Sequence, residues 1–216
     1  SYINHNLLKN LNEVEIEIIN KKKWYLNIFS IVRNNGWIGR DLKKNHRAKI
    51  IFKFNDGFKC QDLAKIRFHG DNPDHYKVID DFHIISSLNI QLSQSNIENI
   101  TQFKLFLPNT RGDENEIFAT NFLKSLKYFA PKTKKLKVKI DGVETEYLFQ
   151  EKISKELVES EGFPEGPIIE GDQRFLTTGM RNLHLGRIVN KNWSSRNWRN
   201  AYISLNALSK LNQEYL

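Results

Sequence analysis

The stretch Phe103–Ile153, FKLFLPNTRGDENEIFATNFLKSLKYFAPKTKKLKVKIDGVETEYLFQEKI, decides most of what the sequence predicts about the fold. It opens with Phe103–Leu107, a mostly apolar run that stops at Pro108, which is typical of a short strand. A polar turn follows. Apolar residues then recur every three or four positions until Pro131, which cannot continue a helix. We therefore expect a strand, a turn and a helix in this order.

The predicted helix has a start signal and a wide apolar face. Asp113 precedes it, and Glu116 lies three residues further on, as in a variant of the capping box. The apolar positions of this helix are Phe118, Ala119, Phe122, Leu123, Leu126, Phe129 and Ala130. The residues that we expect in the protein core are Phe118, Phe122, Leu126, Val138 and Ile140.

Two hairpins are predicted from their turns. Asp141 with Gly142, and Asn55–Gly57, supply the residues that tolerate the positive φ angles of tight turns. The segments that flank these turns are Leu136–Ile140, Val143–Gln150, Ala48–Phe54 and Phe58–Phe68.

Further strands are expected at Glu13–Asn20, where Val14, Ile16 and Ile18 alternate with glutamates, and at Ile84–Leu92. Lys23–Val32 is apolar and is read as either a strand or a short helix.

The last part of the chain changes character. A short helix is predicted from Ser154 to Glu161 and a short strand at Gly166–Glu170, whereas Gln173–Val189 shows no clear period. A final helix, capped by Ser194 or Ser195, carries its apolar residues on one face. These residues are Trp198, Ala201, Tyr202, Leu205, Leu208 and Leu211.

These segments predict an α+β fold, with an antiparallel β-sheet, one central helix packed on it and a helical C-terminal extension. We expect one domain over residues 1–172. The helical extension over residues 173–216 is interpreted as the start of a second lobe.

Composition favours an anionic partner in a reducing compartment. The 216 residues carry a net charge of +8, which attracts phosphate, nucleotide, nucleic acid or acidic glycan. The single cysteine, Cys60, excludes an internal disulfide, and no run of residues is long and apolar enough for a signal peptide or a membrane span. We therefore expect a cytoplasmic protein. Lys135, Lys137 and Lys139 are read first as the solvent face of a strand and second as an anion-binding stripe.

Five segments in a fixed order resemble the CotH family of spore-coat and related proteins, which are atypical kinases. The segments are Ile66–Asp71, Phe103–Leu107, Asn115–Pro131, Val138–Ile153 and Glu165–Asp172. The strongest match is Tyr147–Ile153 together with Glu170–Asp172, and the whole resemblance covers about half of the chain.

The resemblance implies a fold like the N-terminal lobe of an atypical kinase. It also implies an ATP- and Mg²⁺-dependent phosphotransferase that acts on a protein or glycan acceptor. The sequence departs from the family pattern at Ile85–Ser87, where lysines are usual, and at Thr145 or Glu146, where a glycine is usual. The family's catalytic and metal-binding aspartates have no counterpart before Leu216, so the catalytic residues stay unknown.

A kinase-type lobe holds phosphates with a strand lysine that a helix glutamate orients. Lys104 and Glu116 occupy these positions, and Glu151 and Lys152 lie where a kinase chain passes to its second lobe. These four residues are our predicted cofactor-binding set. The alternative is that Lys104 faces solvent, Glu116 caps the helix, and Glu151 with Lys152 form a surface ion pair, an interpretation that the residues themselves favour.

Other sites are weaker. His69, Asp71, Asp74 and His75 resemble a set of metal ligands, but their loose spacing favours a solvated loop, and no metal site is predicted. Thr110–Asp113 is read either as an anion-binding loop at a helix start or as a plain turn. Motifs of nucleic-acid-binding proteins are absent from the sequence. The alternative to a phosphotransferase is a non-catalytic scaffold or a binding module for acidic glycan or another anionic partner.

Overall fold

The computed structural model describes residues 7–34, 36–79, 83–172 and 185–214. Its contacts divide the chain into two compact units, Ser1–Lys152 and Ile153–Leu216, which we describe separately. The division predicted at residue 172 stays a prediction. Within the described ranges, none of the helices is both long enough and apolar enough to cross a membrane.

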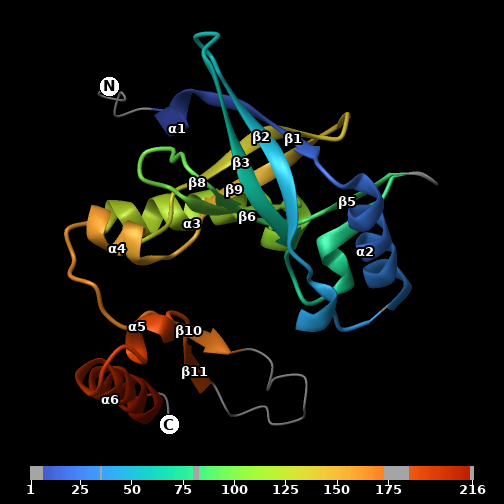
Figure 1. Ribbon diagram of the computed structural model, residues 1–216. Coiled ribbons are helices and arrows are strands. Elements are labelled where there is room, and N and C mark those ends of the chain that lie inside the picture. Colours follow the sequence, from blue (N-terminus) through green and yellow to red (C-terminus); the bar gives the residue numbers. More distant parts are fainter. Residues whose placement is uncertain (1–6, 35, 80–82, 173–184, 215–216) are drawn as a thin grey trace. The chain divides into compact units, whose positions relative to one another are not determined.

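The first unit is built around a closed barrel of seven strands (Figure 1). Going around the barrel, the strands are β1 (Leu11–Ile18), β2 (His46–Phe54), β3 (Lys59–Phe68), β6 (Leu88–Leu92), β7 (Gln102–Phe106), β9 (Val143–Glu151) and β8 (Thr133–Ile140). Neighbouring strands are antiparallel except β1 and β8, which are parallel and close the barrel.

The barrel corrects the predicted fold class. An antiparallel sheet with a packed central helix, like a kinase N-terminal lobe, is wrong because β1 pairs with β2 on one side and with β8 on the other. Closure turns the apolar face of every strand towards one interior, so that side chains from the strands themselves fill the core. The barrel is therefore not an open sheet with one central helix packed across its apolar face.

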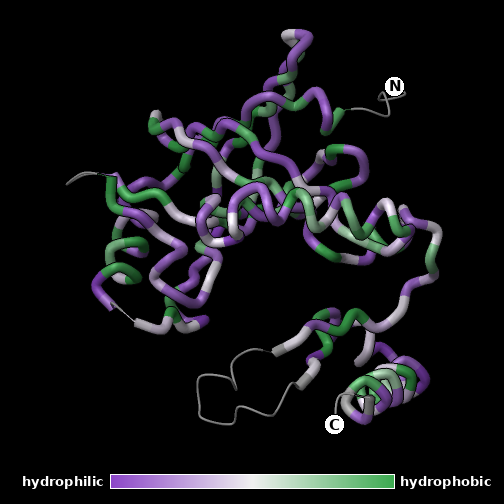
Figure 2. The backbone as a smooth tube through the Cα atoms, turned by 180° about the vertical axis from the view of Figure 1, so that it is seen from behind, coloured by the Kyte–Doolittle hydropathy of each residue, from purple (hydrophilic) through white to green (hydrophobic). Residues whose placement is uncertain are grey.

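Alternating residues of the strands fill this interior. The change between polar and apolar residues along each strand is visible in Figure 2. Large strand side chains in the core include Ile16, Ile50, Phe52, Phe68, Phe103, Tyr147 and Phe149. The strands predicted at Glu13–Asn20 and in both hairpins are therefore confirmed, whereas the single strand predicted at Ile84–Leu92 is two strands, β5 (Ile84–Ser86) beside β4 (Tyr76–Val78), and β6 in the barrel. Val138 is also buried, as expected, and Ile140 packs against the core.

The turn between β8 and β9 holds the closing pair together. Asp141 and Gly142 both have positive φ, +46° and +98°, as their sequence predicts for a tight hairpin. The Asp141 amide donates a hydrogen bond to the Ile16 carbonyl, and its carboxylate accepts one of 3.0 Å from the Ile18 amide. Lys21 lies 3.4 Å from the same carboxylate. One turn residue therefore fastens β8 to β1.

Helix α2 (Lys21–Asn34) settles the alternative left open for this segment in favour of a helix. Trp24, Ile28 and Ile31 on one of its faces are buried in the barrel core. The Asn27 side chain is also buried, where it donates to the Leu42 carbonyl at 2.6 Å. These contacts fix which face of α2 looks outward.

Helix α3 (Glu114–Ser125) lies against β8 with an orientation opposite to the predicted one. Phe118 and Phe122, expected in the core, are 71% and 52% exposed, and Leu126 is exposed as well. The buried residue of the helix is Thr120 instead. Asp113 precedes the helix without a side-chain capping bond, so the predicted capping box is also wrong.

A hydrogen bond joins the polar side of α3 to the outer surface of the barrel. The Gln150 side chain on β9 points outward and donates to the Glu116 carboxylate of α3. A polar strand surface is satisfied by the polar side of a helix. Helical periodicity predicts which residues share a face, but it does not predict which face meets the neighbouring element.

We expect the double substitution Phe118→Ser and Phe122→Ser to leave the free energy of unfolding within about 0.5 kcal/mol of the unchanged protein, because both rings are exposed. A core substitution such as Val138→Ala is expected to remove about 2 kcal/mol. Urea unfolding of the two variants checks this contrast. A large loss in the serine variant would show that the face is covered.

The remaining elements of the first unit surround the barrel. They are α1 (Leu7–Asn10), β4 (Tyr76–Val78), β5 (Ile84–Ser86) and the short 3₁₀ helices η1 (Arg40–Leu42), η2 (Pro73–His75) and η3 (Pro108–Arg111).

The second unit contains α4 (Lys155–Ser160), the antiparallel pair β10 (Ile169–Asp172) and β11 (Leu185–Ile188), α5 (Lys191–Ser194) and α6 (Trp198–Glu214). The predicted final helix is confirmed as α6, but its predicted cap is wrong: Ser194 ends α5, and Asn197 accepts the Asn200 amide at the start of α6. Its residues Leu208 and Leu211 lie next to Gly186 of β11, where an added Cβ would meet both side chains at 3.1 and 3.0 Å. Most of Gln173–Val189 lies outside the described residues.

Candidate functional site

Lys104 and Glu116 of the predicted set lie on the same outer surface of the barrel. Lys104 on β7 is the register partner of Gln150 on β9. The Gln150 Nε2 atom donates a hydrogen bond of 2.5 Å to Glu116 Oε1. The predicted strand lysine and helix glutamate are therefore both next to Gln150, a residue that the sequence did not single out.

Phe106, two residues after Lys104, is the centre of a cationic cluster. Its ring is fully buried, although it does not belong to the barrel core. The Arg111 guanidinium lies 4.4 Å from the ring centroid and the Lys104 ammonium 5.7 Å. Both distances are within the range of cation–π attraction. One aromatic ring thus collects two positive side chains, from β7 and from η3.

Two histidines complete the surroundings of this ring. The centroid of His69 lies 5.0 Å from that of Phe106, and the two histidine rings are 5.6 Å apart and nearly perpendicular. Gly70 lies between them in the chain with φ +108°. A Cβ at this position would collide with the His75 ring, so the glycine is required both by its backbone angle and by the space.

Both histidines are neutral at pH 7. Burial lowers the pKa of His69 to about 2, with further lowering by Lys104, His75, Arg111 and Lys43. Burial is also the main cause that lowers the pKa of His75.

The charges around His75 act in both directions. Asp74 and Asp71 raise its pKa, whereas Arg111 and Lys43 lower it. Asp71 is itself paired with Lys43. The Nδ1 atom of His75 is buried and has no hydrogen-bond partner among the described residues.

We name the cluster of His69, His75, Lys104, Phe106 and Arg111 the Phe106 surface. Sequence reasoning treated the two histidines as possible metal ligands and Arg111 as part of a loop, and it missed Phe106. One signal was present: Lys104 and Phe106 are two positions apart, so their side chains lie on the same side of a strand.

The side chains of Glu151 and Lys152 make hydrogen bonds with different partners. Glu151 is register partner of the core residue Phe103, is buried, and accepts a hydrogen bond of 3.2 Å from the Lys132 amide. Lys152 instead donates to Gln102 Oε1 at 2.7 Å.

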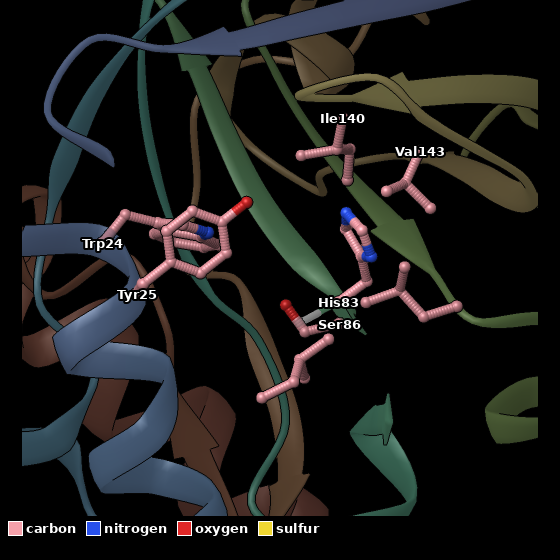
Figure 3. A pocket seen from close by; sticks show the side chains of 8 residues that line it. Trp24, Tyr25, His83, Ser86, Ile140 and Val143 are labelled. Atoms are coloured by element: carbon pink, nitrogen blue, oxygen red, sulfur yellow. The ribbon is translucent and has the colours of Figure 1, made fainter. Parts of the chain in front are cut away.

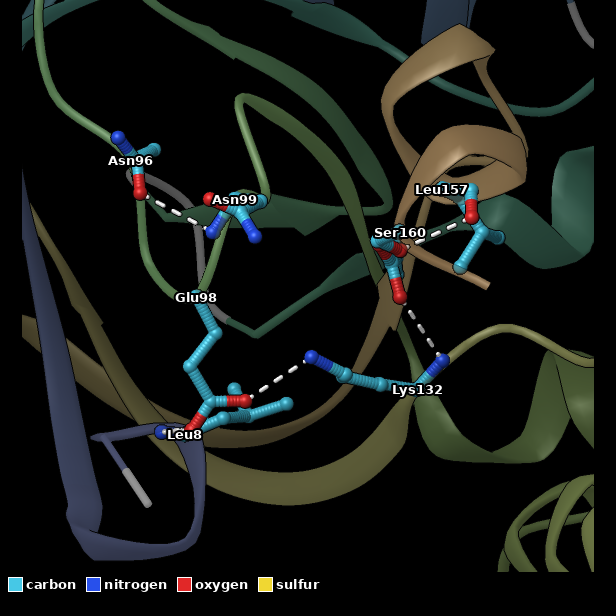
Figure 4. A network of polar contacts seen from close by, with 8 residues as sticks. Leu8, Asn96, Glu98, Asn99, Lys132, Leu157 and Ser160 are labelled. Atoms are coloured by element: carbon cyan, nitrogen blue, oxygen red, sulfur yellow. Dashed lines mark hydrogen bonds and ion pairs between the residues drawn. The ribbon is translucent and has the colours of Figure 1, made fainter. Parts of the chain in front are cut away.

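The Lys132 side chain belongs to a structural network (Figure 4). It lies 3.0 Å from Glu98, whose second carboxylate oxygen accepts the Leu8 amide. This network fastens α1 and the loop after β6 to the end of the barrel, and we assign it a structural role.

A cavity at the other end of the barrel is small. Trp24 and Tyr25 of α2 approach it from one side, and Ile140 and Val143 from the β8–β9 turn (Figure 3). It encloses about 20 Å³, the space of a single water molecule. It is too small for a nucleotide. Among the described residues, no group of three or more His, Cys, Asp or Glu side chains is placed to hold a metal ion.

The lysine stripe of β8 is paired with carboxylates. Lys135 lies 3.1 Å from Glu146, Lys137 lies 3.9 Å from Glu144 and Lys139 lies 4.0 Å from Glu15. Its solvent-facing character is confirmed because these side chains are outside the barrel. Its use as an anion-binding stripe is disfavoured, because each ammonium already has a carboxylate neighbour.

No model of a known protein family matches this chain, and no curated protein matches it. The resemblance to the CotH family therefore stays a prediction.

Proposed function

We propose that this chain is a non-catalytic binding module for a phosphate-bearing or similarly anionic ligand, which binds at the Phe106 surface. The observation that carries this proposal is the convergence of Lys104 and Arg111 on one aromatic ring. An anion bound over this ring would be attracted by both positive charges. The net charge of +8 favours the approach of such a ligand.

Arg111 is the best anchor for this anion. Its side chain belongs to an exposed residue, and within the described part of the chain it pairs with no carboxylate. A guanidinium carries N–H groups in a planar fork that suits the oxygens of a phosphate, and contact with the Phe106 ring restricts where this fork lies. The buried Nδ1 atom of His75 is a further polar group beside it.

The surface fits a phosphate better than a whole Mg-ATP. A nucleotide also needs a slot or an aromatic face for its base, and the Phe106 ring is fully buried. Glu151 and Lys152, the other half of the predicted set, engage Lys132 and Gln102. The binding module is therefore favoured over the phosphotransferase, which stays a prediction.

The test is binding of inorganic tripolyphosphate by calorimetry, with Mg-ATP as a second probe. We expect Arg111→Ala to weaken tripolyphosphate binding about tenfold or more, because a charge-assisted contact is lost. Lys104→Ala is expected to weaken it as well. The measurement is the dissociation constant at low and at moderate salt, since the affinity of a polyanion falls with salt.

Lys65→Ala is the control, because Lys65 is an exposed lysine on β3 and removes the same charge. An equal loss in Lys65→Ala and Arg111→Ala would mean that only net charge matters, and the Phe106 surface would be rejected. Absence of tripolyphosphate binding at millimolar concentration would reject the binding module itself. Tight binding of Mg-ATP without binding of tripolyphosphate would instead favour the phosphotransferase hypothesis.

A further inference from the structure

Helix α2 carries a second apolar face that the barrel does not use. Leu26 and Phe29 are 62% and 50% exposed, although both side chains are large and apolar. They lie between Lys22 and Arg33 at the spacing i, i+4, i+7 and i+11, which forms one straight stripe along a helix. The outward stripe therefore reads basic, apolar, apolar, basic.

This stripe is fixed in place by the opposite face. Trp24, Ile28 and Ile31 are buried in the barrel core, so α2 cannot rotate to bury Leu26 and Phe29. Ile19 before the helix and Trp37 after it are large apolar side chains that are exposed as well. We name Ile19, Lys22, Leu26, Phe29, Arg33 and Trp37 the α2 stripe.

The sequence of α2 and its flanking segments carries charges of a single sign. Between Ile19 and Arg40 the sequence has no Asp or Glu, whereas its basic residues are Lys21, Lys22, Lys23, Arg33 and Arg40. Lys21 is paired with Asp141. Within the part of the chain that the structure describes, Lys22, Lys23 and Arg33 are exposed and pair with no carboxylate.

We propose that the α2 stripe binds the surface of an anionic lipid bilayer, with α2 lying parallel to it. Large apolar side chains flanked by Lys and Arg are the pattern of helices that lie in the interface of a membrane. Leu26 and Phe29 enter the boundary between headgroups and acyl chains. Lys22 and Arg33 extend their charged ends to the lipid phosphates, and Trp37 occupies the headgroup level.

The other exposed apolar helix shows what distinguishes α2. Phe118 and Phe122 of α3 are as exposed as the α2 stripe, but α3 begins with Asp113 and the acidic Glu114. Acidic residues are repelled by an anionic bilayer. Charge complementarity therefore assigns the membrane to α2.

Flotation of the full chain with vesicles tests this assignment. The vesicles contain phosphatidylcholine with about one third phosphatidylserine, and pure phosphatidylcholine vesicles are compared with them. We expect binding to the anionic vesicles that weakens with salt. Leu26→Ser with Phe29→Ser is expected to weaken it about tenfold or more, and Lys22→Ala and Lys23→Ala about fivefold each.

The matched control is Phe118→Ser with Phe122→Ser, which removes equally exposed rings from α3 and is expected to leave binding unchanged. An equal loss in both double variants would overturn the assignment to α2, and equal binding to neutral vesicles would overturn the role of charge. No flotation with anionic vesicles would overturn the proposal as a whole. Circular dichroism of each variant verifies its fold, and a blue shift of Trp37 fluorescence that disappears in Trp37→Phe supports insertion.

Discussion

Replacement of Asp141 by alanine is expected to lower the free energy of unfolding by about 2 to 4 kcal/mol. The Asp141 side chain is only 3% exposed and accepts the Ile18 amide across the parallel pair that closes the barrel. Alanine removes this acceptor and leaves a buried N–H without a partner, which costs about 1 to 3 kcal/mol. It also places a non-glycine residue without a polar side chain at φ +46°, which adds about 1 kcal/mol.

Two further variants separate these causes. Asp141→Asn keeps an acceptor and tolerates the left-handed conformation, so we expect a loss of about 1 kcal/mol. Asp56→Ala changes the aspartate before the glycine of the β2–β3 turn, which has no positive φ and whose carboxylate accepts the nearby Phe58 amide, and is expected to cost about 0.5 kcal/mol.

Urea unfolding measures these losses, and amide hydrogen exchange locates them. Exchange at Ile18 is expected to accelerate in Asp141→Ala and to stay slow in Asp56→Ala. If Asp141→Ala and Asp56→Ala lose equal stability, the link between β8 and β1 is not what the Asp141 carboxylate provides.

Acidification from about pH 7 to about pH 5 is expected to lower the free energy of unfolding by about 1 to 2 kcal/mol through His69 alone. The pKa of His69 is about 2 in the folded protein, whereas the ordinary value for a histidine, which we take for the unfolded chain, is 6.5. Below about pH 6.5 the His69 side chain is therefore protonated in the unfolded chain but stays neutral in the folded protein. Stability is fully present above pH 6.5 and is lost as the pH falls below that value.

The groups that face His69 all act in this direction. They are the positively charged Lys104, Arg111 and Lys43, with His75 beside them. His75 and His46 also have lowered pKa values, mainly through burial, and add to the loss with the same sign. Carboxylates with lowered pKa values, such as Asp62, contribute only at lower pH.

Substitution of His69 by glutamine is expected to flatten the dependence of stability on pH between about pH 7 and pH 5. Lys104→Met is expected to leave this slope nearly unchanged, because burial, the main cause of the lowered pKa, still keeps His69 neutral in the folded protein over this range. Urea midpoints at several pH values provide the measurement. An unchanged slope in His69→Gln would contradict the neutral, buried state of this ring.

The strands were predictable because alternation is a local property. Val14, Ile16 and Ile18 alternate with glutamates, and this pattern alone predicts which side of β1 is buried. The β8–β9 turn was predictable from Asp141 and Gly142 for the same reason. Nothing local shows that β1 pairs with β8, because an edge strand of an open sheet has the same alternation as a strand in a closed barrel.

The candidate site was predictable only in part. Lys104 and Glu116 were expected to be neighbours, and both lie next to Gln150. Phe106 was not expected to have a role, because a phenylalanine in a strand is normally a core residue. Its importance depends on Arg111 and His69, which come from other segments and meet only in the folded chain.

The parallel pair joins the first and a late strand of the first unit, so the barrel can close only after β8 has been synthesised. Glu13 of β1 pairs with Lys137 of β8, so β1 leaves the ribosome long before its partner exists. Until then β1 is an exposed edge on which another chain can add a strand. Its side chains Glu13, Glu15 and Glu17 place negative charge along that edge. Charged side chains along a strand edge disfavour such pairing, and in the folded chain the same glutamates lie beside lysines of β2 and β8.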